Sequence, residues 1–231
     1  MVEHSKKYQR TGFWMKSREA AGKRAVKLIS EAFDAAGVPY FLDYGTLLGC
    51  VRNKEFIAVD NDIDFGICAE NYTPKLIDEL KRTTGSQLVC MSGVSADVLK
   101  PLWYGEACKN NIMPPQKEVN KEKWVVYIGV AVDDPENKVR MPCDIYIHYL
   151  AKGRWEGYRW FWITGMKVPR HLLENLTTTT FYDMEVSIPK EAEAYLELLY
   201  STSWRIPAEV IAPYKYLTAE YLEELERRKD K

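Results

Sequence analysis

Three aspartates, Asp60, Asp62 and Asp64, lie at alternate positions in the stretch VDNDIDFGI. If residues 62–68 form a strand, Asp62 and Asp64 lie on one face and the apolar residues between them on the other. Two carboxylates this close repel each other unless a cation lies between them. Because the ligands are oxygen atoms rather than His or Cys, the pattern favours Mg²⁺ or Mn²⁺. The alternative interpretation is a polar turn followed by a solvated carboxylate at a strand edge.

Gly45 and Thr46 begin a segment, residues 45–52, with the pattern of a short helix that follows a strand. Glycine lets backbone N–H groups come close to an anion, and the N-terminus of a helix favours negative charge. Arg52 lies about two helical turns further on and is expected on nearly the same side, where a guanidinium holds phosphate oxygens well. These three residues are therefore candidate phosphate ligands. A simple N-cap by Thr46 would explain the same pattern.

A further carboxylate lies far along the chain, in the stretch PCDIYIHY. If residues 143–150 form a strand, Asp144, Tyr146 and His148 share one face. His148 is a candidate base, and a histidine satisfied by hydrogen bonds inside the protein is the alternative. Carboxylates on two strands beside a glycine turn predict phosphoryl or nucleotidyl transfer, because that chemistry depends on positioning and charge neutralisation.

The segments around these residues have mixed helical and strand patterns. Helical spacing of small and apolar residues predicts a helix from Ser17 to Ala36, capped by Gly37. Further helices are predicted at 73–84, 191–200 and 219–228. Extended segments are predicted at 38–42, 56–68, 124–132 and 143–150, with a turn at 133–138, whereas 93–123 is expected to be rich in loops.

Composition limits the classes of protein that fit. The chain has 231 residues, of which 46% are hydrophobic and 28% charged, and its formal charge is −1. It therefore lacks the basic excess that draws a protein onto nucleic acid or anionic membranes. The N-terminus lacks the apolar core of a signal peptide, and the longest apolar run is too short to span a bilayer. We expect a cytoplasmic protein with no transmembrane segment. Its five scattered cysteines have the spacing of free thiols.

The stretches DYGTLLGCVR, NKE and FIAVDNDIDFGI together resemble the signature of the LicD and fukutin-related family, a branch of the DNA polymerase β-like nucleotidyltransferase superfamily. PCDIYIHY resembles the family's third-aspartate strand, and IPKEAEAYLELLYSTSWRIP resembles its C-terminal segment. The resemblance implies an α+β fold: a nucleotidyltransferase-like mixed β-sheet flanked by helices, with a helical C-terminal segment. We expect a single domain over residues 1–231, with its core at about 17–150 and an extension at about 151–231 packed on it.

The resemblance implies a transferase that takes a phosphorylated alcohol from a CDP-linked donor, such as CDP-choline or CDP-ribitol, to a sugar or glycan hydroxyl and releases CMP. Asp62 and Asp64 would hold Mg²⁺ (or Mn²⁺) on the diphosphate, and Asp144 would complete the metal site or take the acceptor proton. The implied phosphate ligands are Gly45, Thr46 and Arg52. The implied supporting residues are Asp43, Asp60 and His148.

Several positions depart from the family pattern. Asn61 replaces the usual middle aspartate, and Ser201 replaces a glycine of the C-terminal motif. Two other functions stay open: transfer of a nucleotide from an NTP to a small molecule, and a pseudoenzyme scaffold, which only Asn61 favours. The oligomeric state also stays open. A candidate acceptor platform is formed by Trp155, Tyr158, Trp160, Phe161 and Trp162.

Overall fold

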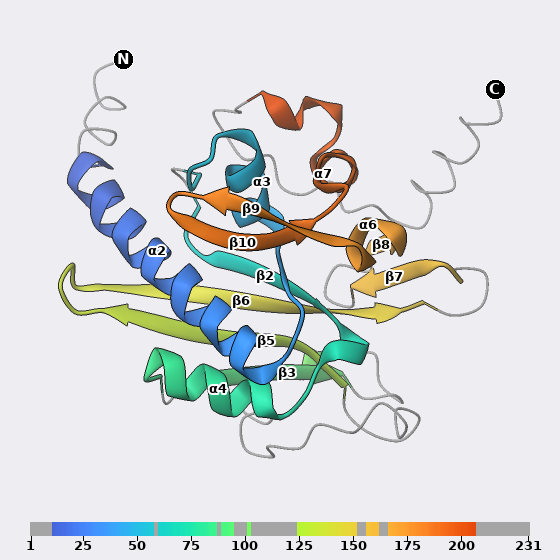
Figure 1. Cartoon of the computed structure of the whole chain (residues 1–231), viewed down its shortest axis with the longest axis horizontal. Coiled ribbons are helices and arrows are strands. Elements are labelled where there is room, and N and C mark those ends of the chain that lie inside the picture. The colour runs from blue at the N-terminus through green and yellow to red at the C-terminus, as the bar shows by residue number, and fades with distance from the viewer. Residues whose placement is uncertain are drawn as a thin grey trace.

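The computed structural model of the chain describes residues 11–57, 60–86, 89–94, 101–102, 124–151, 156–161 and 166–206. Its centre is a mixed sheet in which neighbouring strands follow the order β1-β2-β6-β5-β3-β4 (Figure 1). A short extension, β7 and β8, continues from the end of β6. The strands of this sheet are β1 (Phe41–Leu42), β2 (Ile63–Cys68), β3 (Val89–Val94), β4 (Pro101–Leu102), β5 (Trp124–Asp134), β6 (Val139–Leu150), β7 (Tyr158–Phe161) and β8 (Met166–Pro169).

Strands β2 and β6 form the parallel pair at the centre of this sheet. Their register places Asp64 opposite Asp144 and Cys68 opposite His148. The other strand pairs described are antiparallel, including the long hairpin of β5 and β6. The parallel pair therefore brings together two carboxylates from distant parts of the sequence.

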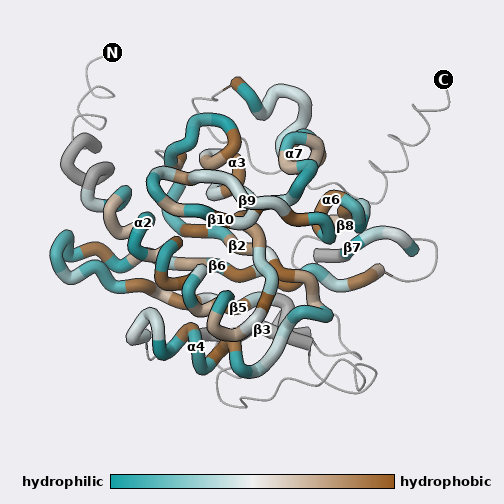
Figure 2. Tube along the Cα trace, viewed as in Figure 1, coloured by the Kyte–Doolittle hydropathy of each residue, from teal (hydrophilic) through white to brown (hydrophobic). Residues whose placement is uncertain are grey.

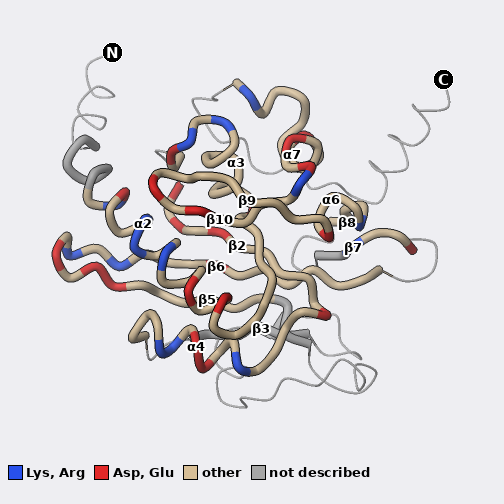
Figure 3. Tube along the Cα trace, in the orientation of Figure 1, with Lys and Arg blue, Asp and Glu red and all other residues tan. Residues whose placement is uncertain are grey.

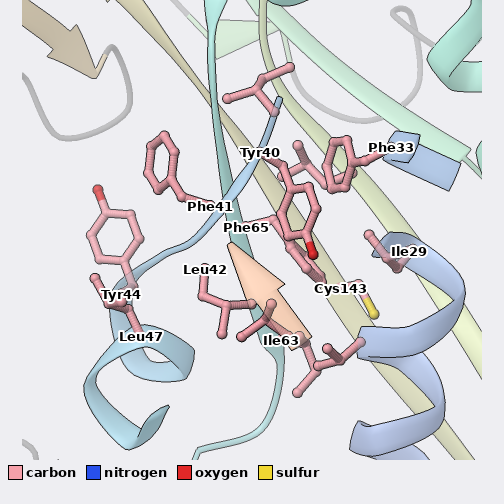
Figure 4. Packing of buried hydrophobic residues seen from close by; sticks show 14 of the residues in the cluster. Ile29, Phe33, Tyr40, Phe41, Leu42, Tyr44, Leu47, Ile63, Phe65 and Cys143 are labelled. Carbon is pink, nitrogen blue, oxygen red and sulfur yellow. The ribbon is translucent and has the colours of Figure 1, made fainter. Parts of the chain in front are cut away.

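Two helices, α2 (Thr11–Ala36) and α4 (Lys75–Thr84), lie side by side on one face of the sheet (Figure 1). Phe33 of α2 stacks on Tyr40 at 4.7 Å between ring centroids and lies 5.6 Å from Phe65 of β2. Figure 4 shows these side chains together with Ile29 and Ile63 in the core. Each such fully buried apolar side chain contributes about 1.5–3 kcal/mol to stability. The apolar face predicted for β2 is confirmed.

The remaining helical elements are α3 (Tyr44–Arg52) and the 3₁₀ turn η1 (Ala69–Asn71), which precede β8, and α6 (His171–Glu174), α7 (Ala192–Tyr200) and the 3₁₀ turn η4 (Thr202–Arg205), which follow it. A second antiparallel hairpin, formed by β9 (Leu176–Phe181) and β10 (Met184–Pro189), contacts β1. Helix α3 packs on both β2 and α7. Hydrophobic residues line the central strands in Figure 2, and Figure 3 shows both signs of charge interspersed along the chain.

The structure confirms the predicted α+β, nucleotidyltransferase-like class and most of the predicted elements. Helices α2, α3, α4 and α7 and strands β2, β5 and β6 lie where their patterns indicate. Strand β2 begins at Ile63 rather than near residue 56, and β3 and β4 occupy part of the segment expected to be loop-rich. The hairpins β7–β8 and β9–β10 were not predicted. The predicted helix at 219–228 lies outside the described residues. The single-domain prediction over residues 1–231 extends into undescribed segments and stays a prediction.

A buried arginine joins the strand extension to the central sheet. Arg159 of β7 is fully buried, and its guanidinium donates to both carboxylate oxygens of Glu70 and to Glu174 Oε1 at 2.6 Å. It also donates to the carbonyl of His148 at 3.1 Å. Because Glu70 belongs to η1 and Glu174 to α6, one side chain links four elements.

Three cysteines are described with their side chains, and all three are free and buried: Cys50, Cys68 and Cys143. Burial raises the pKa of Cys50 to about 11 and that of Cys68 to about 12, so both thiols stay protonated at neutral pH. Free thiols were predicted, and for these three cysteines the prediction is confirmed. In the part of the chain that the structure covers, none of the helices combines the length and apolar character that crossing a membrane requires.

Ser201 ends α7 in a conformation suited to glycine, with φ 72° and ψ 175°. Such a backbone costs about 1–3 kcal/mol in a residue with a side chain. Ser201→Gly should therefore stabilise the protein by about 1 kcal/mol, because the relieved strain exceeds the greater freedom that glycine gives the unfolded chain. Chemical denaturation measures this change.

The side chain of Ser201 has one interaction that the substitution removes, a 3.0 Å contact between its hydroxyl and that of Ser203. Ser203→Ala removes the same contact without changing residue 201 and is the control. A Ser201→Gly protein less stable than wild type would show that the hydroxyl matters more than the backbone strain.

Candidate active site

Helix α3 begins beside β2, and Asp43 is its N-cap. The backbone of Asp43 is extended, and its carboxylate accepts a hydrogen bond from the N–H of Tyr44 at 2.8 Å. Its own N–H donates to the carbonyl of Asp64 at 3.0 Å. Capping of this kind satisfies a donor that the first turn of a helix leaves open. The sequence DYGT thus starts the helix against the strand that carries the aspartates.

The first turn of α3 holds Asp64, which is only 4% exposed. The N–H of Gly45 donates to Asp64 Oδ2 at 3.1 Å, and the N–H of Asp64 donates to the Thr46 hydroxyl at 2.9 Å. Both candidate phosphate ligands of this turn therefore contact Asp64, Gly45 at its carboxylate and Thr46 at its backbone N–H. Their role toward phosphate stays a prediction.

Asp60, Asp62 and Asp64 form a cluster in which one carboxylate oxygen from each residue lies within 4.8 Å of the others. Gly45 makes room for it, because a Cβ at this position would lie 2.0 Å from Asp60 Oδ2. The cluster confirms the predicted proximity of Asp62 and Asp64. It also includes Asp60, which the sequence indicated only as a supporting residue.

Two carboxyl groups of this cluster, those of Asp60 and Asp64, resist ionisation. Burial raises the pKa of Asp60 to about 7, with further contributions from a hydrogen bond and the charge of Asp62. Burial also raises the pKa of Asp64 well above its usual range, and the charges of Asp62 and then Asp60 raise it further. Like charges held together in this way are relieved by a cation, and three oxygen ligands suit Mg²⁺ or Mn²⁺. The donor set therefore fits the predicted metal.

Asp60→Asn should stabilise the protein in EDTA at pH 8, on the order of 1 kcal/mol, because it removes one of the repelling charges. A carboxyl whose pKa is raised by folding contributes stability below its unfolded pKa, and this contribution is lost as pH rises through about 7. The gain should therefore shrink at pH 5. Thermal melts at the two pH values measure it.

The matched control for this substitution is Asp183→Asn, which changes an exposed aspartate in the turn between β9 and β10. It should leave the melting temperature nearly unchanged at both pH values. An Asp60→Asn protein that melts below wild type at pH 8 in EDTA would show that the carboxylate supports the fold.

Asp144 lies on β6 next to this cluster, opposite Asp64 in the register. Its Oδ1 accepts a hydrogen bond from the Tyr127 hydroxyl at 2.6 Å, and its Oδ2 accepts one from the Tyr146 hydroxyl at 3.4 Å. Gly129 makes the first contact possible, since a Cβ there would lie 2.7 Å from the Tyr127 hydroxyl. Tyr127 was not predicted as a site residue from the sequence, although Tyr127 and Gly129 are two positions apart and therefore share one face of the predicted strand.

Asp144 differs in its environment from the three clustered aspartates. Burial raises its pKa, the hydrogen bond from Tyr127 opposes that rise, and the charge of Asp62 adds to it. The predicted ligand set of Asp62, Asp64 and Asp144 therefore differs by one residue from the set that the structure groups together. Whether Asp144 binds metal or takes a proton stays a prediction.

Asn61, the departure from the family pattern, points out of the cluster. Its side-chain oxygen accepts a hydrogen bond from Arg18 of α2 at 3.0 Å, and its carbonyl accepts another from the same guanidinium. The residue is exposed. The missing acid therefore removes a charge at the edge of the site and leaves the three clustered carboxylates in place.

Arg52 lies at the opposite end of α3 from Gly45, about 10 Å away along the axis of a helix. Its Nε donates to the Asn53 side chain at 2.9 Å, and Nη1 donates to the carbonyl of Trp204 at 3.2 Å. The structure thus places Arg52 between the helix end and the C-terminal segment. Its predicted contact with phosphate stays a prediction.

His148 lies inside the protein and is fully buried. Its Nε2 lies 2.9 Å from Asp43 Oδ2, and Oδ1 of the same carboxylate accepts a hydrogen bond from the Tyr195 hydroxyl at 2.8 Å. This arrangement matches the alternative of a histidine satisfied within the protein. Tyr195 belongs to α7 and was not among the residues singled out from the sequence.

The proposed aromatic platform falls mainly on residues whose side chains the structure does not describe. Trp155 and Trp162 lie outside the described residues, and Tyr158, Trp160 and Phe161 lie on β7. The acceptor role of these aromatic residues therefore stays a prediction.

The comparison with protein families agrees with this geometry. The profile described as "LicD/FKTN/FKRP, nucleotidyltransferase domain" matches residues 37–191, more than half of the chain. The chain belongs to the LicD/FKTN/FKRP family. The matched segment contains α3, the aspartate cluster, Asp144 and His148, and it ends just before α7.

Curated relatives in this family are named ribitol-5-phosphate transferases. The chain is 27% identical over 188 residues to "Ribitol-5-phosphate transferase FKTN" of Mus musculus, which covers 80% of this chain and 33% of the relative. It is 25% identical over 190 residues to the Homo sapiens protein of the same name, covering 81% and 34%. The chain thus spans about a third of the length of the curated relatives that it matches.

Proposed function

We propose that this LicD/FKTN/FKRP family member is a metal-dependent phosphotransferase that moves a phospho-alcohol group from a CDP-linked donor to a sugar or glycan hydroxyl. The observation that carries the proposal is the cluster of Asp60, Asp62 and Asp64, with ligand atoms within 4.8 Å of one another at the first turn of α3. The names of the relatives support a phosphorylated polyol as the group transferred.

The residues that would hold the metal are Asp62 and Asp64, with Asp60 as a third oxygen ligand. Mg²⁺ or Mn²⁺, when bound, supplies positive charge that neutralises the diphosphate of the donor. In its absence the raised pKa values of Asp60 and Asp64 show how strongly burial and mutual repulsion oppose their ionisation.

The chain's own residues would position the two substrates. The acceptor hydroxyl gives its proton to the Asp144 carboxylate, and its oxygen forms a bond to the phosphorus that carries the alcohol. The bond from that phosphorus to the bridging oxygen breaks, and CMP leaves with the electron pair. Tyr127 and Tyr146 hold the Asp144 carboxylate during this step. Gly45 and Thr46, in the first turn of α3, would bind the phosphates of the donor. Arg52, at the other end of α3, would contribute positive charge toward them.

The test incubates the protein with Mg²⁺ and, separately, CDP-ribitol, CDP-choline, CDP-glycerol, CDP-ethanolamine, CTP and ATP, with free hexoses and N-acetylhexosamines as acceptor probes. CMP and a new phosphodiester from one CDP-alcohol are expected. Excess EDTA should stop the reaction, and a zinc-selective chelator should not, because the site is built from oxygen ligands.

The other outcomes identify the alternatives. Pyrophosphate released from an NTP would replace the proposal with nucleotidyl transfer. No product, together with no binding of Mg²⁺ or CDP-alcohols by calorimetry, would indicate a pseudoenzyme. Turnover that persists in excess EDTA would remove the metal from the proposal.

A further inference from the structure

Helix α7 lies outside the part of the chain that matches the family profile, which ends at residue 191. It nevertheless reaches the candidate site. Tyr195 is fully buried, and its hydroxyl donates a 2.8 Å hydrogen bond to Asp43 Oδ1. Burial, and next the charge of Asp43, raise the pKa of Tyr195 well above its usual range, so the phenol keeps its proton and remains a donor.

Asp43 is the residue on which several elements converge. Its fully buried carboxylate accepts from the N–H of Tyr44 and from Tyr195 of α7, and it contacts His148 of β6. A buried carboxylate is costly unless hydrogen bonds satisfy it, so these contacts hold one another in place. Asp43 also donates its backbone N–H to the carbonyl of Asp64.

The backbone just after Asp43 is strained. Tyr44 has φ 38°, a value that residues with side chains rarely adopt. Such a conformation persists only where the surrounding contacts enforce it. It is followed directly by Gly45 and Thr46, which hold Asp64 by hydrogen bonds to its carboxylate and its backbone N–H. The placement of Asp64 therefore depends on a strained turn that Asp43 fixes.

The segment after Tyr195 reaches the other end of the same helix. Arg52, the last residue of α3, donates to the carbonyl of Trp204 in η4. The C-terminal segment thus contacts α3 at both ends, through a side chain at one and a backbone carbonyl at the other. A rigid helix held in this way keeps its first turn in register with β2.

We infer that Tyr195 is a positioning residue for the reaction: through Asp43 it fixes the first turn of α3 and with it the carboxylate of Asp64. The predicted effect on kcat rests on the proposed function. The predicted effect on the order of the first turn of α3 rests on the contacts alone. A shift of about 1 Å in a catalytic group is enough to slow a reaction by orders of magnitude. The loss of one hydroxyl far from the substrate should therefore be visible in kcat.

The test compares Tyr195→Phe with Tyr40→Phe. Each variant removes one buried hydroxyl with a 2.8 Å hydrogen bond, but Tyr40 contacts Ser30 of α2 in the core and has no such bond to Asp43. Both should lower the melting temperature by similar amounts. Tyr195→Phe should lower kcat about tenfold or more while the KM for the CDP-alcohol changes less than about twofold. Tyr40→Phe should leave kcat nearly unchanged.

A second measurement does not depend on any activity. Amide hydrogen exchange of residues 43–50 should quicken in Tyr195→Phe and not in Tyr40→Phe, because only the former loosens the start of α3. If no donor reacts with wild type, the proposed function fails, and the exchange comparison still decides the positioning role. Equal exchange and equal kcat in the two variants would overturn the inference.

Discussion

Asp64→Asn should abolish the proposed transfer while the protein stays folded. The substitution keeps the shape of the side chain, and the amide oxygen can still accept the hydrogen bond from Gly45. It removes one charged oxygen from a cluster whose members lie within 4.8 Å of one another. We expect kcat to fall by more than about a hundredfold, since even changes to groups that only support metal ligands reduce activity or affinity by 10–100-fold.

Although Asp64→Asn should lower kcat, it should not lower the stability of the protein. In EDTA, Asp64→Asn should melt at or above the temperature of wild type, because it removes a carboxyl whose ionised form is disfavoured by burial and by the neighbouring acids. Asp183→Asn, an exposed change of the same kind, controls for both measurements. A variant that unfolds, or one that transfers at a nearly normal rate, would show that Asp64 supports the fold and not the chemistry.

Arg159→Met should destabilise the protein by about 1–3 kcal/mol, because the two carboxylates that lose their donor are 40% and 28% exposed and can be partly hydrated. Arg159 is fully buried and bridges Glu70 and Glu174, so its loss leaves two carboxylates facing each other. The carbonyl of His148 loses a donor at the same time. Urea denaturation at pH 7 measures the effect.

The pH dependence of this variant separates charge from packing. In wild type, burial favours a higher pKa for Glu70, but the hydrogen bond from Arg159, a backbone hydrogen bond and the charges of Arg159 and Arg170 together lower the pKa. The ion pair therefore stabilises wild type above the unfolded pKa of about 4.5, and this contribution is lost as pH falls through the folded value. The difference between Arg159→Met and wild type should shrink at pH 4.

The double variant Arg159→Met/Glu70→Gln is the matched control, because it removes one of the two carboxylates that the first substitution exposes to each other. It should be more stable than Arg159→Met alone at pH 7. A single variant as stable as wild type at pH 7, or a deficit that does not depend on pH, would show that Arg159 contributes mainly by filling space.

Local patterns predicted that Asp62 and Asp64 lie close together, because the two residues are only two positions apart at the start of β2. The alternation of Asp62, Ile63 and Asp64 is sufficient to separate a charged face from an apolar one, and Phe65 indeed packs against Phe33. Helices α2 and α4 were similarly visible from their apolar spacing and their glycine ends. These features require only short-range information.

Contacts between distant segments had no comparable signal. Tyr195 reaches Asp43 from 152 positions away, and Tyr127 reaches Asp144 across a strand pair whose register the sequence does not display. The hairpin of β9 and β10 was missed because β9 is a run of mostly exposed threonines, although β10 alternates between apolar and polar residues. Arg52 was correctly predicted to lie at the end of the helix. Its hydrogen bond to the carbonyl of Trp204 was not predicted, because it depends on where the C-terminal segment packs.

The parallel pairing of β2 with β6 also has a consequence for how the chain folds. Hairpins such as β5–β6 and β9–β10 join neighbouring segments and close in about 1–10 μs. Asp64 meets Asp144 only when a loop of about 80 residues closes, and the entropy of that closure must be overcome before the contact forms. During synthesis β2 leaves the ribosome well before its partner strand, and α7 follows later still. The carboxylate site should therefore be among the last parts of the molecule to assemble, and its capacity to bind ligands should return after helical structure during refolding.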